Sequence, residues 1–123
     1  MNEEFFSQAV ANGIDQTFIQ AADQFGRDIS RRVTTSQIRS IFGSVKKMEM
    51  GGEADMATLL LLKPRIAYAA SRNRSLDTLK TVLTRAIDAV DKAQDKEQRQ
   101  ERFRRFCQGF EAILAYHRAY GGK

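Results

Sequence analysis

Residues 59–72 read LLLLKPRIAYAASR, a strongly apolar run that passes directly into a basic segment. Four consecutive leucines point to every side of a helix, so they cannot all face water, and the run is predicted to form core or a subunit interface. Pro64 lacks a backbone N–H, and its ring clashes with the carbonyl of Leu60, so a helix must kink here or break near Leu62. No good N-cap residue precedes the proline, which favours one kinked helix over residues 53–74.

Beyond the proline, two arginines and a tyrosine share one stripe of this helix. Arg65, Tyr68 and Arg72 are spaced i, i+3 and i+7, and Lys63 and Arg74 add positive charge at either end. A guanidinium can bind a phosphate through two hydrogen bonds, and a tyrosine ring can stack on a base. The stripe is therefore a candidate nucleic-acid site. The alternative is an ordinary solvated helix face with the tyrosine half-buried.

The composition predicts a single all-α domain. The chain has 123 residues, of which 42% are apolar and 28% charged, with one proline and many alanines, a composition that favours helix. A chain of this length buries about two thirds of its unfolded surface. Valine and isoleucine form no alternating runs of the kind expected in strands. We therefore expect one domain over residues 1–123, a compact bundle of about five helices with the proline-containing helix at its centre.

Three features bear on the compartment. No stretch of 18 apolar residues is present, so no transmembrane helix is predicted. The start, Met-Asn-Glu-Glu, is acidic where a signal peptide would be basic. The single cysteine excludes an intramolecular disulfide and fits a reducing environment. The sequence predicts a cytoplasmic protein with no membrane contact.

The net charge of +5 is unevenly distributed along the chain. Residues 1–30 carry a net charge of −4, residues 31–75 a net charge of +6 and residues 76–123 a net charge of +3. A concentrated positive patch attracts polyanions and releases counterions when it binds them. The middle segment therefore predicts a nucleic-acid partner, with an acidic protein surface as the competing possibility.

Apolar periodicity divides the chain into elements. Gly26 is expected to end the first long helix, Thr35 or Ser36 to cap the next, and the Gly51-Gly52 pair to make a turn after it. The predicted elements are a frayed start over 1–13 and helices over 14–25, 36–50, 53–74 and 76–90. A final helix follows, which turns apolar residues from Phe103 to Leu114 inward and ends before Gly121-Gly122.

The second long helix carries a further basic face. Arg39 and Lys46 lie seven residues apart and share a side away from the core, and Lys47 flanks Lys46. Gly43 falls between them, at a cost in helix propensity of about 1 kcal/mol against alanine. It would permit close approach of an RNA strand or of a neighbouring helix, or it would only relieve packing.

Residues for catalysis are not present in a usable pattern. Cys107 and His117 lie ten residues apart on one predicted helix, a rise of about 15 Å, which is too far for a nucleophile and its base. One cysteine and one histidine are too few ligands for zinc, and no glycine-rich phosphate loop occurs. We expect His117 at the surface or in an interface beside Tyr116. The sequence predicts no enzyme, no cofactor and no metal.

Three blocks in order carry a resemblance to a known family. They read TTSQIRSIFGSVKK, LLLLKPRIAYAASR and FEAILAYHRAYGG, and together they cover about residues 33–122. The chain resembles the small subunit of type III-A CRISPR RNA-guided effector complexes, the Csm small subunit. The middle block is the most specific, and the first thirty residues carry no part of the resemblance.

The resemblance implies a helical, non-catalytic RNA-binding subunit in antiviral defence. Such subunits are present in several copies and stack along a filament of backbone subunits, while nuclease and cyclase activities belong to other subunits. The implied partners are the CRISPR guide RNA and target RNA, the backbone and other subunits, and further copies of the chain. The candidate RNA-binding residues are Arg39, Lys46, Lys47, Lys63, Arg65, Tyr68 and Arg72.

Two other functions fit parts of the sequence. An all-helical adaptor could use the same basic face to bind an acidic protein, and charge alone does not exclude it. A helix-turn-helix regulator of DNA is the weaker alternative. The helix after Gly51-Gly52 is dominated by leucine, whereas a recognition helix would present polar side chains.

Overall fold

The computed structural model describes residues 2–52 and 55–122 and confirms the all-α prediction. Within those ranges there are no strands, and one helix more than expected is present. The elements are α1 (Phe5–Asn12), α2 (Gln16–Ile29), α3 (Thr35–Met50), α4 (Met56–Arg72), a short 3-10 helix η1 (Arg74–Leu76), α5 (Asp77–Asp91) and α6 (Lys96–Ala119).

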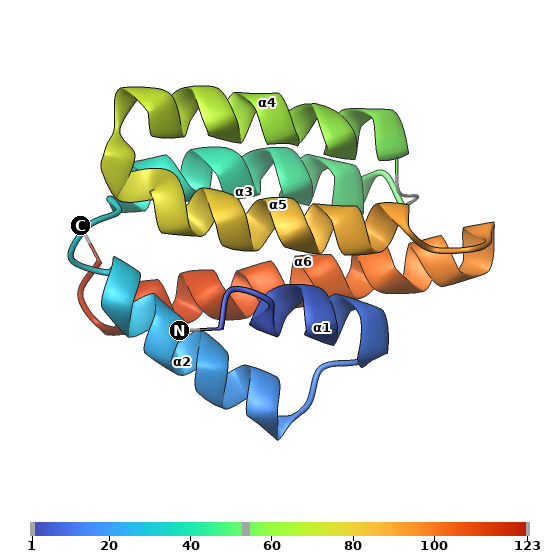
Figure 1. The fold of residues 1–123 in the computed structure, drawn as a ribbon, viewed down its shortest axis with the longest axis horizontal. Helices are drawn as coiled ribbons and strands as arrows, with labels where there is room; N and C mark the ends of the chain where they lie inside the picture. Colours follow the sequence, from blue (N-terminus) through green and yellow to red (C-terminus); the bar gives the residue numbers. More distant parts are fainter. Residues whose placement is uncertain (1, 53–54, 123) are drawn as a thin grey trace.

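Helix α6, and not the proline-containing helix, is the hub of the bundle. It packs against α1, α2, α3 and α5, whereas α4 packs mainly on α5 and only lightly on α3. In Figure 1, α4 lies along one side of the molecule and α2 along the opposite side. The expectation of a central position for the proline-containing helix was therefore wrong. A helix that keeps a broad polar face, as α4 does, can bury only one side.

The leucine run forms a single helix that continues through Pro64, as predicted. Leu59 and Leu62 are buried in the core, and Leu60 is half-buried. Leu61 is 63% exposed. Two of the four leucines therefore hold α4 on the bundle, and one lies open at the surface.

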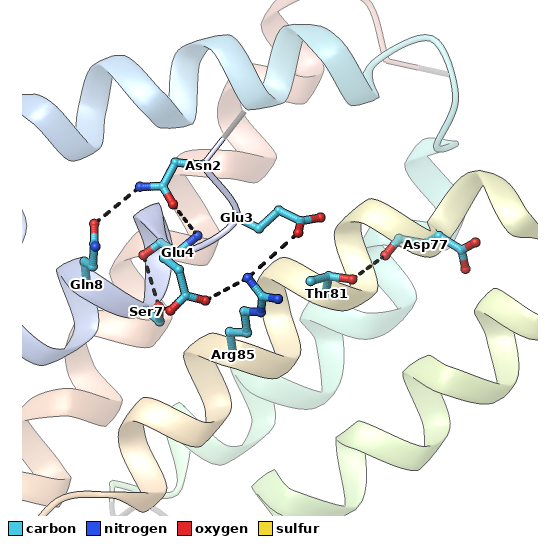
Figure 2. Close-up of polar contacts among 8 residues, drawn as sticks. All are labelled: Asn2, Glu3, Glu4, Ser7, Gln8, Asp77, Thr81 and Arg85. Atoms are coloured by element: carbon cyan, nitrogen blue, oxygen red, sulfur yellow. Dashed lines mark hydrogen bonds and ion pairs between the residues drawn. The ribbon is translucent and has the colours of Figure 1, made fainter.

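The prediction of a frayed start over residues 1–13 was wrong for residues 5–12, which form α1. Phe6 is completely buried and stacks on Phe106 of α6, with ring centroids 5.4 Å apart. Figure 2 shows Arg85 of α5 holding the start of this helix, through Glu4 at 2.9 Å and Glu3 at 3.8 Å. The aromatic pair Phe5-Phe6 at the start of α1 is the feature of the sequence that could have predicted this packing. Residue 1 lies outside the described residues.

Two helix boundaries differ from those expected. Gly26 lies inside α2, where a β-carbon would come within 2.5 Å of Cβ of Tyr116, so this glycine permits close packing on α6 and does not end the helix. Thr34 caps α3, one residue before the expected Thr35. Its side chain accepts a hydrogen bond from the backbone of Gln37, whose side chain in turn accepts one from the Thr34 N–H.

His117 is buried, which contradicts the surface position expected for it. Its Nε2 lies 2.6 Å from the carbonyl oxygen of Val33, in the connection between α2 and α3. The chain after α6 then folds back over the ring, and the Thr35 hydroxyl donates to the carbonyl of Gly122 at 2.9 Å. The histidine therefore closes this end of the core.

Apolar spacing predicts a buried stripe on each of the last two helices, and both stripes are confirmed except at Leu114, which is only partly buried. The buried members are Leu76 in η1, Leu79, Val82, Leu83, Ala86, Ile87 and Val90 in α5, and Phe103, Phe106, Cys107, Phe110 and Ile113 in α6.

Candidate nucleic-acid interface

The stripe predicted beyond the proline lies on the exposed side of α4. Arg65 and Arg72 are exposed, and the Tyr68 side chain is 64% exposed. Nη1 of Arg72 donates to the Tyr68 hydroxyl at 3.2 Å, and the Arg72 guanidinium carbon lies 5.8 Å from the centre of the tyrosine ring. This cation–π contact holds the two side chains together at the surface. The alternative of an ordinary solvated helix face expected a half-buried tyrosine, and Tyr68 is more exposed than that.

A groove of about 430 Å³ runs between α3 and α4, with both arginines in its lining. The two helices are antiparallel (Figure 1), and Nη1 of Arg65 donates at 2.8 Å to Oγ of Ser44, an α3 residue just outside the lining of the groove. The lining residues are Ser36, Gln37, Ser40, Ile41, Leu62, Arg65, Ile66, Ala69, Arg72, Asn73 and Leu76. The light packing of α4 on α3 leaves this space open.

The polar wall that α3 contributes to the groove was missed in the sequence. Ser36 and Ser40 line the groove, and Ser44 continues the row as the partner of Arg65. Their i, i+4, i+8 spacing places them on one helix face, which is the pattern that could have revealed the wall. Serines in a helix carry no strong signal by themselves, because they are common on solvated faces.

Two of the predicted basic residues are engaged in ion pairs. Nζ of Lys63 lies 2.6 Å from Oδ1 of Asp88, so this lysine turns toward α5 and away from the groove. Nζ of Lys46 lies 3.0 Å from Oε1 of Glu49, and the hydrogen bond and charge of this glutamate raise the pKa of the lysine. Both lysines are partly neutralised by their partners.

Arg39 and Lys47 are exposed, and the structure gives them no ion pair among the residues it describes. Lys47 follows Ser40 and Ser44 at i+7 and i+3, so it continues the groove wall along α3. Gly43 lies open, and a β-carbon there would meet no group within 4 Å. Close approach of another chain at this glycine stays a prediction.

Two arginines of α6 serve the fold instead of a binding face. Nη1 of Arg105 donates to the carbonyl of Val10 at 3.1 Å, at the C-terminal end of α1. Nη1 of Arg102 donates to the carbonyl of Ala89 at 2.7 Å, near the C-terminal end of α5. Cations at these positions satisfy free carbonyls and complement the helix dipole. The positive charge of the last segment is therefore partly structural.

The described residues contain no group of three or more His, Cys, Asp or Glu side chains placed to hold a metal ion. Cys107 is buried, and burial raises the pKa of its thiol to about 12. A thiol in this state does not supply a nucleophile near neutral pH. In the described part of the chain no helix combines the length and apolar character needed to cross a membrane.

Comparison with known families gives a match over most of the chain. A family model described as Csm2 Type III-A matches residues 14–123. The chain belongs to this family. Csm2 is the non-catalytic small subunit of the type III-A CRISPR effector, the Csm complex, so the resemblance in the sequence is confirmed. The match includes α3, α4 and the groove between them and leaves out α1.

No curated protein and no solved structure gives a significant match to the chain.

Proposed function

We propose that this Csm2 subunit holds the guide–target RNA of its effector complex through the face formed by α3 and α4. One observation carries the proposal: Arg65 and Arg72 lie along one groove, with the exposed Tyr68 beside Arg72. Pairing between guide and target supplies sequence specificity in such complexes, so the subunit needs only contacts to the RNA backbone and shape.

The candidate residues divide by their surroundings. Arg65, Tyr68 and Arg72 form the centre of the proposed RNA face because they are exposed and adjacent. Arg39 and Lys47 on α3, which form no ion pair with any described residue, support them. The remaining candidates, Lys46 and Lys63, contribute less because each faces a carboxylate within about 3 Å.

The exposed apolar side chains fit contacts with neighbouring subunits. Leu61 on α4 is 63% exposed, and Met50 at the end of α3 is 79% exposed. A contiguous exposed apolar patch marks a site where another protein packs, and we propose that Leu61 and Met50 take part in such contacts. The proposed partners are the guide and target RNAs, the backbone and other Csm subunits and further copies of this chain, in a cytoplasmic assembly.

The test is a tagged purification of the chain from its native host, with sequencing of the RNA and identification of the proteins that are retained. Three forms are compared: the wild type, the double variant Arg65→Glu/Arg72→Glu, and the control Lys92→Glu/Arg104→Glu. The control makes the same charge change at two exposed positions away from this face, one directly after α5 and one on α6. We expect the wild type and the control to retain short RNAs from a CRISPR array together with effector subunits.

The double variant is expected to retain the protein partners with less RNA and to keep its helical circular-dichroism signal. Retention of protein partners without RNA by the wild type would favour the adaptor function instead. Equal RNA recovery from the double variant and the control would show that Arg65 and Arg72 do not contribute to RNA binding.

A further inference from the structure

We infer that the groove between α3 and α4 binds an unstacked base of single-stranded RNA, an inference that rests on the proposed RNA-binding function of this face. Most of a backbone-binding surface should be polar and shallow. This groove instead combines a cavity of about 430 Å³ with an apolar floor. That volume is in the range of sites that enclose small ligands.

The floor of the groove suits the flat face of a base. Its accessible apolar surface comes from the partly buried Ile41 and Ala69, and the core residues Leu62, Ile66 and Leu76, each only 2–3% exposed, close the groove from below. A phosphate or ribose gains nothing from such a surface, because their polar groups would lose water without a partner. A nucleobase can leave water for an apolar contact because both of its faces are apolar enough to stack.

The middle of the groove is open because its two walls carry small side chains. Ser40 on α3 and Ala69 on α4 line the groove between the positions of the two arginines. The serine hydroxyls of the α3 wall can donate to or accept from the edge of any base, so they offer hydrogen bonds without strong sequence preference.

The charges at the two ends suit the phosphates on either side of such a base. Arg65 and Arg72 are seven residues apart, a rise of about 10.5 Å along α4. Each uses one guanidinium nitrogen in the hydrogen bonds described above, to Ser44 and Tyr68, and keeps further N–H donors. No aspartate or glutamate lines the groove. By contrast, a pocket of about 520 Å³ between α1 and α2 is lined by Asp15 and by no cation, so it does not suit an anion.

A paired base cannot enter this site, because its faces are covered in the duplex stack. The groove should therefore distinguish single-stranded RNA from duplex RNA, while the surrounding charges attract both. Exposed Tyr68, beside Arg72, offers a second stacking surface for a neighbouring base.

The experiment measures fluorescence anisotropy of the full chain with three labelled probes of equal length: oligouridine, the same strand with abasic sites, and duplex RNA. The variant Ala69→Phe fills the groove and keeps both arginines. Its control is Ala67→Phe, the same change on the same helix at an exposed position that does not line the groove. We expect the wild type to prefer oligouridine over the abasic strand by about tenfold, the effect of one stacked base.

Ala69→Phe should remove this preference and leave duplex binding unchanged, and Ala67→Phe should behave like the wild type. Equal affinity of the wild type for oligouridine and the abasic strand would overturn the base site and leave the proposed function intact. Failure of the wild type to bind any of the three probes would contradict both. If Ala69→Phe does not fold, Ser40→Phe fills the groove from the exposed α3 wall, and the same two outcomes apply.

Unchanged RNA affinity in the filled variants, with loss of Csm protein partners, would show that a neighbouring subunit occupies the groove. That result would also overturn the base site.

Discussion

Gly26 and Gly43 both lie inside helices, but their surroundings differ completely. A β-carbon at Gly26 would lie 2.5 Å from Cβ of Tyr116 and 2.9 Å from the backbone nitrogen of His117, both on the central helix α6. A β-carbon at Gly43 would meet nothing within 4 Å. Glycine is therefore required for close packing at position 26 in α2, whereas at position 43 in α3 it only lowers the helix propensity.

Gly26→Ala should destabilise the isolated chain by about 1–3 kcal/mol, because α2 must move away from α6 to make room. Gly43→Ala should stabilise it by up to about 1 kcal/mol, because alanine is the better helix former and meets no obstacle. Urea denaturation of the two variants and the wild type gives the free energies of unfolding. A stabilising effect of Gly26→Ala would show that the close approach of α2 and α6 is wrong.

Cys107 should be unreactive in the folded chain. Burial raises the pKa of this thiol to about 12, so almost no thiolate is present at pH 8. A disulfide reagent should label Cys107 slowly at pH 8 and rapidly after addition of denaturant, when the thiol recovers its ordinary pKa. The unfolded thiol then loses its proton at lower pH than the folded one. The contribution of Cys107 to stability is therefore complete below about pH 8 and falls as the pH rises toward 12. Rapid labelling of the folded chain at pH 8 would contradict this burial.

At the scale of elements, α1 is attached mainly by aromatic packing. Phe6 is completely buried against Phe106, whereas the Arg85 ion pair with Glu4 at the start of the helix is half-exposed. Burial of a phenylalanine is worth several kcal/mol, and an exposed ion pair is worth less than about 1 kcal/mol. The ion pair is therefore expected to orient α1 and to add little to the free energy of unfolding.

Phe6→Ala should lower the free energy of unfolding by about 3–5 kcal/mol, and Arg85→Ala by less than about 1 kcal/mol. Chemical denaturation at low and at moderate salt measures both, and the small effect of Arg85→Ala should shrink further as salt screens the pair. Equal losses in the two variants would mean that the ion pair, and not the aromatic cluster, holds α1 in place.

The sequence predicted the elements whose pattern is regular and missed those that depend on tertiary contacts. The stripes of α5 and α6 and the single helix through Pro64 follow from spacing and from one proline. The docking of α1 and the burial of His117 depend on partners far along the chain, Phe106 and Val33, which no local pattern reveals.

The candidate site shows the same division between local and tertiary information. The spacing of Arg65, Tyr68 and Arg72 predicted their common face, which the structure shows. The groove beside them arises from the pairing of α3 with α4, so neither its depth nor its apolar floor could be predicted from one helix alone. The turn of Lys63 toward Asp88 likewise required the position of α5.

At the scale of the whole molecule, the acidic and basic segments of the sequence form different pairs of helices. Residues 1–30, which carry a net charge of −4, include α1 and α2, and residues 31–75, which carry +6, include α3 and α4. In Figure 1, α4, the outer helix of the basic segment, lies on the opposite side of the bundle from α2 of the acidic segment. This separation gives RNA one favoured side of the subunit to approach.

The measurement that tests the central claim most directly is the salt dependence of RNA binding by the isolated chain. For single-stranded RNA each phosphate contact contributes about 0.7 to the slope of log affinity against log salt. Arg65→Glu/Arg72→Glu should therefore weaken binding and reduce the magnitude of that slope by about 1.4, while Lys92→Glu/Arg104→Glu should leave the slope unchanged. Equal slopes for the wild type and the Arg65→Glu/Arg72→Glu variant would contradict the assignment of the α3–α4 face to RNA.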